Sequence, residues 1–316
     1  MTGAALESWV DDPNERAEAL RRVIAVVNEK GGVGKTSIVA NLAGQTARAG
    51  YRVLALDLNR QGNLGLDLGF SGTSIDDEGR GLLAAIMMGQ ALRPARDVRP
   101  NLDVIAGGPQ LEGLTPLMIT RMTQERQAAF LALGKALAPL AREYDLVFID
   151  CPPENTILDD LALGAARWVL IPTKSDDGGL AGMRLVAERF LKAREINPVL
   201  RLLGVVLFGT GTKATAIHAE VREAITESFG GHSPLFNATV RHSERVAREA
   251  RKGRLAHELE EEAEQQPAWW EMLRRGEKVQ RISPTVSGVA ADYQALAAEV
   301  LTTLRDAENA EVEAQA

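Results

Sequence analysis

The sequence predicts an α/β fold: a doubly wound, mostly parallel sheet with helices on both faces and a helical elaboration toward the C-terminus. Short apolar runs without polar alternation recur along the chain, separated by longer segments of helical periodicity, which is typical of parallel strands buried on both faces. Aromatic residues make up only 4% of the 316 residues, which favours this class over an all-β sandwich.

The apolar runs are the expected strands, and Gly or Pro clusters end two of them. The third run stops at Gly107-Gly108-Pro109 and the fourth at Cys151-Pro152-Pro153. The expected strands are residues 23–27, 53–57, 102–106, 146–150, 168–172 and 202–208.

Helical periodicity fills the segments between these runs and dominates the last third of the chain up to residue 305. Ser283-Pro284 is a typical helix start, with a capping residue followed by Pro at the first helical position. The expected helices are residues 34–49, 120–142, 179–194, 214–228, 243–264 and 283–305.

The chain is interpreted as one large domain with additions. The domain spans residues 23–306 and includes a helical insertion at about 255–282. A helical extension, residues 1–22, precedes it, and an acidic tail, residues 307–316, follows and is expected to fray.

Composition excludes several classes of protein. The single cysteine, Cys151, rules out an internal disulfide, a four-cysteine zinc site and a cysteine-ligated cluster within one chain. The net charge of −7 argues against a uniformly basic nucleic-acid binder, although a local basic patch remains open. Because the chain has neither a signal-peptide pattern nor an apolar run of membrane-spanning length, we expect a cytoplasmic protein.

The strongest motif runs from Asn28 to Ser37, between the first strand and the first helix. Its glycines expose backbone N–H groups to a phosphate, and the helix N-terminus adds partial positive charge. Lys35 is expected to reach the β and γ phosphates, and the Thr36 hydroxyl to bind Mg²⁺. The loop residues predicted to surround the phosphates, for which the resemblance described next implies ATP, are Lys30, Gly31, Gly32, Val33, Gly34, Lys35, Thr36 and Ser37.

With a second lysine at its start, this loop resembles the deviant phosphate loop of the ParA/MinD family of P-loop ATPases. The resemblance implies that Lys30 reaches across a sandwich dimer to the partner's ATP. A positive charge supplied in this way stabilises the γ-phosphate oxygens, as an arginine finger does in trans. ATP would then form part of the dimer interface, and dimerisation would depend on nucleotide.

Two acidic segments extend the resemblance. Residues 57–63, Asp-Leu-Asn-Arg-Gln-Gly-Asn, resemble the family segment that carries catalytic residues, so Asp57 and Asn59 join Lys30 and Lys35 as the expected catalytic residues. Asp150, which ends the fourth strand, is expected to hold the Mg²⁺ shell through water. Residues 171–173, 204–206 and 240–244 also resemble family landmarks, and in all the resemblance covers residues 23–304.

Asn59 departs from the family, which normally has Asp at this position. An amide cannot accept a proton at neutral pH, so we expect slow or impaired hydrolysis with ATP binding and dimerisation retained. Three explanations stay open: a natural slow variant, use of Asp57 or a partner group instead, and an introduced substitution that traps the ATP state.

A basic stretch near the C-terminal side is the candidate DNA surface. Arg241, Arg245, Arg248 and Lys252 are spaced 4, 3 and 4 apart, which would place them on one face of a helix. Such a stripe can follow a phosphate backbone without reading bases. Arg241 also matches the family's DNA-contacting position. The alternative is a solvated helix paired internally with the acidic residues 258–264.

The sequence therefore predicts a ParA-type ATPase for DNA partition and segregation, with ATP and Mg²⁺ as cofactors. The ATP-bound homodimer would bind DNA non-specifically on the nucleoid, and a ParB-like centromere-binding protein would stimulate hydrolysis and release it. Two alternatives remain: a MinD-like, membrane-associated positioning ATPase, which the acidic tail disfavours, and a hydrolysis-deficient, ATP-gated DNA-binding scaffold or repressor.

Overall fold

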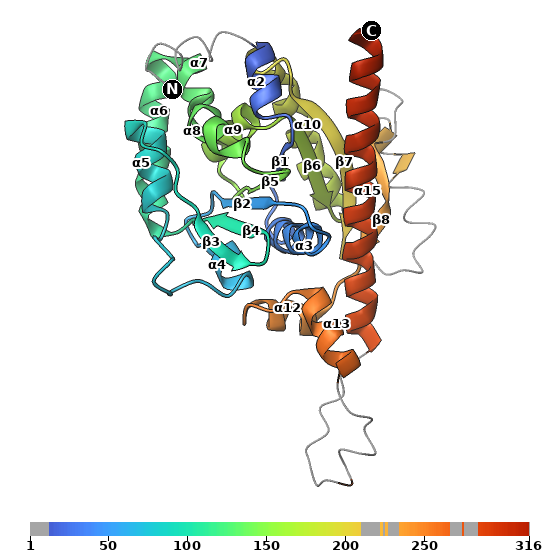
Figure 1. The fold of residues 1–316 in the computed structure, drawn as a ribbon. Coiled ribbons are helices and arrows are strands. Elements are labelled where there is room, and N and C mark those ends of the chain that lie inside the picture. The colour runs from blue at the N-terminus through green and yellow to red at the C-terminus, as the bar shows by residue number, and fades with distance from the viewer. Residues whose placement is uncertain are drawn as a thin grey trace.

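A twisted sheet with helices on both faces organises the chain (Figure 1). The computed structural model describes residues 13–209, 222–223, 225–226, 234–265, 274 and 284–315. Within this part the strands follow the order β3-β4-β2-β5-β1-β6-β7-β8, and every neighbouring pair is parallel except β3 with β4. The strands are β1 Val23–Val26, β2 Val53–Asp57, β3 Ala95–Arg99, β4 Leu102–Ile105, β5 Leu146–Asp150, β6 Trp168–Thr173, β7 Arg201–Phe208 and β8 Leu235–Val240.

The central strands are uniformly apolar because each of their faces meets a layer of helices. In β1, Val23 and Ala25 face one apolar core, while Ile24 and Val26 face the other. The sheet is thereby buried on both sides, as the apolar runs predicted, and the doubly wound fold class is confirmed.

One helical layer contains α2 Pro13–Ala19, α5 Arg80–Met88, α6 Leu114–Gln124, α7 Arg126–Phe130, α8 Ala132–Ala141, α9 Thr156–Ala165 and α10 Asp177–Ile196, with the 3-10 helix η1 Pro109–Gly113. The other contains α3 Lys35–Arg48, α4 Asn63–Asp67, α12 Glu244–Ala250, α13 Ala256–Gln265 and α15 Pro284–Gln315. In Figure 1 the long α15 stands alongside β7 and β8.

The six expected strands are confirmed to within a residue at each end, but β3 and β8 were not expected. Both lack the continuous apolar pattern because they lie at the edges of the sheet, where one or more positions remain exposed. The single helix expected at residues 120–142 is also wrong. The backbone leaves the helical region at Glu125, and a further break at Leu131 separates α7 from α8. The helix expected at 214–228 lies almost entirely outside the described residues.

The C-terminal additions are more integrated than expected. Helix α15 continues to Gln315, so the prediction that residues 307–316 form a frayed tail is wrong. Ion pairs hold its last turns: Glu308 with Arg22 (2.7 Å), and Glu311 with both Arg167 and Arg201. Of the expected insertion 255–282, residues 255–265 belong to the core layer, where Leu255 fills the space beside Gly44.

At the other end of the chain, α2 of the expected extension 1–22 contributes Ala19 to the core, whereas residues 1–12 lie outside the described part. No helix in the part of the chain that the structure describes has the length and apolarity needed to cross a bilayer.

Candidate active site

The loop between β1 and α3 is held in a shape that only glycine permits at two positions. Gly32 and Gly34 have φ of 72° and 87°, in the left-handed region. A Cβ on Gly34 would stand 2.5 Å from the ring of Phe208, so a side chain is excluded there on steric grounds as well. Asn28 anchors the start of the loop: its Nδ2 donates to Pro172 O (2.8 Å), and its Oδ1 accepts from the Lys30 amide (2.8 Å).

Lys35 closes this loop from within. Its Nζ donates to the carbonyl oxygens of Asn28 (2.6 Å) and Lys30 (3.0 Å), and burial lowers the pKa of its ammonium, opposed by the charge of Asp150. An anion in the loop would replace these neutral acceptors with charged ones, and charge-assisted hydrogen bonds are stronger. Of the other predicted loop residues, Val33 is buried and Ser37 lies in the first turn of α3.

Thr36 and Asp150 meet as predicted, although they are far apart in the sequence. The Thr36 hydroxyl donates to Asp150 Oδ2 at 2.7 Å, while Asp150 Oδ1 is buried and has no hydrogen-bond partner among the described residues. Burial raises the pKa of Asp150 to about 7. A hydroxyl and a carboxylate with a free oxygen at the phosphate loop are the hard oxygen donors that Mg²⁺ prefers, so the residues fit this ion.

Asp57 shapes the adjoining loop. It is the register partner of Asp150 on the neighbouring strand, and burial, with Asp150 nearby, raises its pKa well above the usual range. Its Oδ1 accepts from the Asn59 amide (2.7 Å) and its Oδ2 from the Leu64 amide (3.1 Å), at the start of α4. Both oxygens thus fix the backbone between β2 and α4.

Asn59 lies inside the same loop and is 5% exposed. Its Oδ1 accepts from the Gln61 amide at 3.0 Å, a bond that a carboxylate at this position would also make. The backbone amide of Asn59 donates to Asp57, and its side chain has no group that accepts a proton at neutral pH.

Lys30 contacts a residue that the motifs did not identify. Its Nζ forms an ion pair with Asp176 Oδ1 at 2.7 Å, and the two side chains are 33% and 56% exposed. Asp176 follows β6, so its approach to the loop depends on β6 lying beside β1 in the sheet. The ammonium of Lys30 therefore lies on the outer side of the loop, and Lys35 on the inner side.

A second unexpected contact ties the loop to α10. Arg189 pairs with Glu29 (2.9 Å) and with Asp160 (3.0 Å) of α9. No spacing pattern in the sequence connects these three residues, because they come from three separate segments. The guanidinium links the start of the phosphate loop to two helices.

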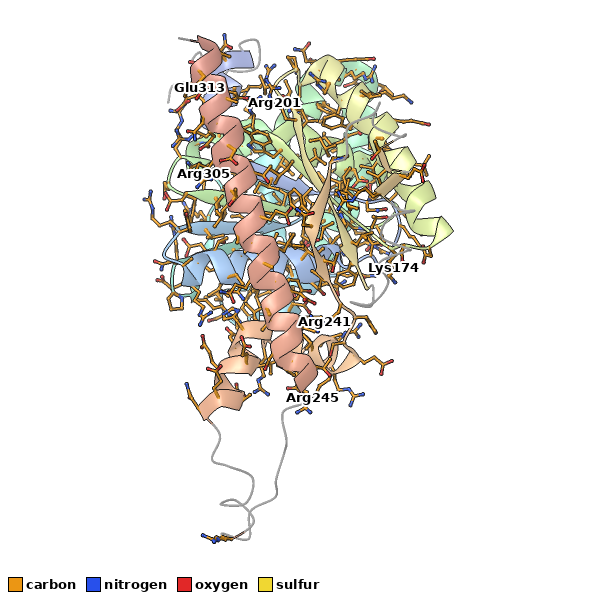
Figure 2. The ribbon with its side chains drawn as sticks, turned by 90° about the vertical axis from the view of Figure 1, so that its right-hand side faces the viewer. Lys174, Arg201, Arg241, Arg245, Arg305 and Glu313 are labelled. Atoms are coloured by element: carbon orange, nitrogen blue, oxygen red, sulfur yellow. The ribbon has the colours of Figure 1, made fainter. Side chains whose placement is uncertain are left out.

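The predicted basic stripe is not one helical face. Arg241 precedes the N-cap Ser243 of α12, and Lys252 follows the helix, so of the four candidates only Arg245 and Arg248 lie on α12. The reason is that Ser243 begins the helix by accepting from the Val246 amide, and α12 ends at Ala250. Figure 2 shows Arg241 and Arg245 near the N-terminal end of α15.

At least two of the four candidates, Arg241 and Lys252, are paired internally, in partial agreement with the alternative interpretation. Arg241 forms a bidentate pair with Asp292 (2.7 Å), and Lys252 pairs with Glu249 (2.8 Å). The acidic run of α13 pairs with other arginines: Glu258 with Arg99, Glu261 with Arg48 and Glu262 with Arg254.

Comparison with known proteins identifies the family. Residues 21–202 match the AAA domain family. The chromosome partitioning protein ParA of Myxococcus xanthus is 34% identical over 203 residues, 64% of this chain and 70% of that protein. ParA of Caulobacter vibrioides is 32% identical over 233 residues, 72% and 82% of the two chains.

Among solved structures, apo McdA of Cyanothece superimposes with a TM-score of 0.64 at 22% identity, covering 76% of this chain and 93% of that one, a likeness of fold. The chain has a P-loop and a Thr36–Asp150 pair that fits Mg²⁺, and it is similar to these ParA proteins over most of its length. It therefore belongs to the ParA family of partition and positioning ATPases.

Proposed function

We propose that the protein is a DNA-partition ATPase whose ATP-bound form is a sandwich dimer on non-specific DNA, with ATP and Mg²⁺ as its cofactors. The observation that carries the proposal is the pair of lysines on opposite sides of one loop, Lys35 inside it and Lys30 on its outer side. Lys35 binds the protomer's own nucleotide, and Lys30 exchanges its ion pair with Asp176 for the nucleotide of a second protomer.

Within one protomer the residues divide the work of binding. The loop amides and Lys35 hold the β and γ phosphates, and Thr36 with Asp150 holds Mg²⁺, directly and through water. Mg²⁺, when bound, neutralises charge on the phosphate oxygens. Asp57 fixes the loop that carries Asn59, and Asn59 orients the attacking water without removing its proton, which makes hydrolysis slow.

Arg245 and Arg248 form the core of the proposed DNA surface, with Arg241 and Lys252 at its ends. Arg248 is exposed on α12, and DNA phosphates would compete with Asp292 and Glu249 for the other two side chains. Two copies of this surface in a dimer bind DNA more tightly than one. A ParB-like centromere-binding protein stimulates release, and the dimer is associated with the nucleoid in the cytoplasm.

A second candidate function rests on Asn59: an ATP-gated DNA-binding scaffold or repressor without useful hydrolysis. It shares the ATP-bound dimer and differs only in lacking stimulated turnover. The described residues do not favour a membrane-associated role. The end of α15 is acidic, and its Glu308 and Glu311 form ion pairs with arginines of the same protein.

The proposal is tested by the mass of the protein in sedimentation velocity with Mg²⁺ and a non-hydrolysable ATP analogue. We expect a dimer for the native chain and a monomer for Lys30→Ala, which keeps nucleotide binding. Lys192→Ala, a lysine of α10, is the control and should dimerise. A native chain that stays monomeric, or a Lys30→Ala variant that dimerises normally, would overturn the proposal.

A further inference from the structure

A third lysine lies against the phosphate loop. Lys174 follows β6, and its side chain runs between two glycines with positive φ, Gly32 of the loop and Gly209 after β7. A Cβ on Gly32 would stand 4.0 Å from Lys174 Nζ, and a Cβ on Gly209 would stand 3.7 Å from its Cε. The absence of side chains at both glycines leaves room for the lysine stem.

The ammonium of Lys174 has no hydrogen bond or ion pair within the described residues, although the side chain is half-buried. A lysine ammonium that interacts only with water usually extends into solvent, since side-chain conformational entropy and hydration of the charge both favour exposure. Here the stem is lodged at the loop and the charge is left without a counter-ion. An anion or other acceptor in the loop would supply one.

The order of the strands indicates which part of a nucleotide Lys174 would meet. Thr36, Asp150 and Asp57 gather over β1, β5 and β2, which places the γ-phosphate and metal on that side of the loop. Lys174 and Gly209 follow β6 and β7, on the opposite side of β1. A nucleotide that crosses the loop with its γ-phosphate over β5 has its nucleoside end over β6 and β7.

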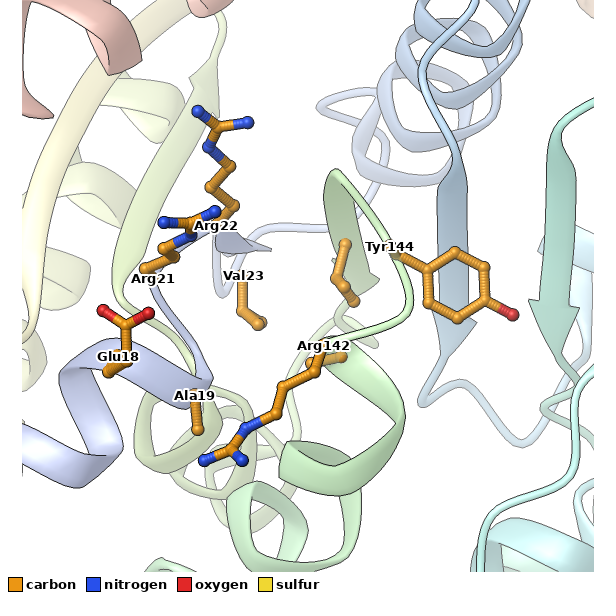
Figure 3. Close-up of a pocket in the computed structure, with 9 residues that line it drawn as sticks. Glu18, Ala19, Arg21, Arg22, Val23, Arg142 and Tyr144 are labelled. Atoms are coloured by element: carbon orange, nitrogen blue, oxygen red, sulfur yellow. The ribbon is translucent and has the colours of Figure 1, made fainter.

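The arginine-lined cavity at the other end of the strands does not compete for this role. It measures about 330 Å³ and is lined by Glu18, Arg21, Arg22 and Arg142 among others (Figure 3). The guanidinium groups of Arg22 and Arg142 point apart in this view, and Arg22 is already paired with Glu308. The cavity therefore offers no convergent set of hydrogen-bond donors for an anion.

We propose that Lys174 is a nucleotide-binding residue, whose ammonium contacts the α-phosphate and ribose of the bound nucleotide while its stem rests between Gly32 and Gly209. This inference rests on the proposed binding of ATP, and it adds a contact on the nucleoside side to those at the β and γ phosphates. Figure 2 shows Lys174 away from the labelled end of α15 at Glu313.

The test is the affinity of the full chain for AMP, ADP and a non-hydrolysable ATP analogue, measured by calorimetry with Mg²⁺. Lys174→Met keeps much of the stem and removes the charge. We expect it to weaken binding of all three nucleotides by a similar factor, about 10-fold or more, because one charge-assisted hydrogen bond to a shared part is lost. Lys174→Arg should recover most of the loss.

Lys135→Met, on α8, is the control, and its affinities should not change. Unchanged affinities in Lys174→Met, or a loss confined to the ATP analogue, would overturn the inference, the latter by placing the amine at the γ-phosphate. A native chain that binds none of the nucleotides would instead refute the proposed function. Thermal unfolding of each variant shows whether a loss reflects misfolding.

Discussion

At the scale of single residues, the site combines buried polar and charged side chains that differ in how their hydrogen bonds are satisfied. Lys35 is satisfied by carbonyl oxygens, and Asp57 by two backbone amides. Asp150 keeps one oxygen without a partner among the described residues, and the Asn59 side chain accepts from the Gln61 amide. The first three features suit tight binding of a metal–triphosphate, and the proposed slow hydrolysis rests on the fourth.

Restoring the carboxylate should raise the hydrolysis rate. Because Asn59 Oδ1 already accepts from the Gln61 amide, Asn59→Asp keeps the local hydrogen bond and adds a proton acceptor. We expect steady-state phosphate release, with DNA and the ParB-like partner present, to rise by about 10² to 10⁴. Gln294→Glu, an exposed change on α15 away from the site, is the control for added charge. Equal turnover of the native and Asn59→Asp proteins would refute a slow native enzyme.

Asp159 of α9 makes stability depend on pH. It is fully buried, neither of its oxygens has a partner among the described residues, and burial raises its pKa to about 7. Lys35 and Arg189 oppose this shift, while Glu29 and Asp160 add to it. Since the folded pKa lies above the unfolded value, the folded protein binds the extra proton. The stabilisation is therefore complete below about pH 4 and is lost as pH rises through about 7.

Asp159→Asn should remove this dependence. Between about pH 5.5 and 8.5 the native chain should lose about 2 kcal/mol of unfolding free energy relative to the variant, which corresponds to roughly 1.5 pH units of titration. Urea denaturation without nucleotide measures it. Glu313→Gln, an exposed change on α15, should show no such trend. A constant difference between Asp159→Asn and the native chain would show that the carboxyl group is not protonated in the fold.

At the scale of elements, the turn that follows α4 is packed directly onto the turn that follows α12, next to the basic segment, residues 241–252. Helix α4 ends near Gly69, and the turn after α12 contains Gly253, where both residues have positive φ. Arg99 of β3 clamps the two turns: its guanidinium donates to Leu68 O and Gly253 O (2.9 Å each) and pairs with Glu258. Helix α4 therefore connects the loop of Asp57 and Asn59, at its start, to the proposed DNA surface, which its far end contacts.

Gly253→Ala should be strongly destabilising. Its Cβ would stand 2.4 Å from Gly69 Cα, which is backbone and cannot rotate away, and φ of 77° adds strain. Gly72→Ala has nearly the same φ, 73°, but open space around its Cβ, so it measures the strain alone, about 1 kcal/mol. We expect Gly253→Ala to lower the melting temperature by at least twice as much as Gly72→Ala. Equal shifts would mean that the two turns are not in firm contact.

At the scale of the whole molecule, α15 joins the two ends of the sheet. Near its start Asp292 holds Arg241, at the edge of the basic segment, and near its end Glu308 and Glu311 hold arginines beside the opposite ends of the strands. Arg167, whose side chain is 8% exposed, depends on Glu311 for its charge partner. The acidic C-terminal residues therefore help to fix a helix, and are not a free tail.

The sequence by itself determined the parallel core of the fold and the identity of the phosphate loop. In a chain of this composition, continuous apolar runs are typical of buried parallel strands, and positive φ in a loop favours glycine, as at Gly32 and Gly34. These signals are local. The loop, Thr36 and Asp150 were therefore predicted residue by residue, and the structure brings Thr36 and Asp150 together.

Only the tertiary structure decided which distant residues meet that loop. Asp176, Lys174 and Arg189 reach it because β6 lies beside β1 and α10 packs on β6 and α9, an arrangement that no spacing along the chain encodes. The same holds for the edge strands β3 and β8 and for the end of α15. β3 and the end of α15 are largely polar, and β8 mixes apolar with polar residues. All three are ordered by neighbours far away in the sequence, not by a periodicity of their own.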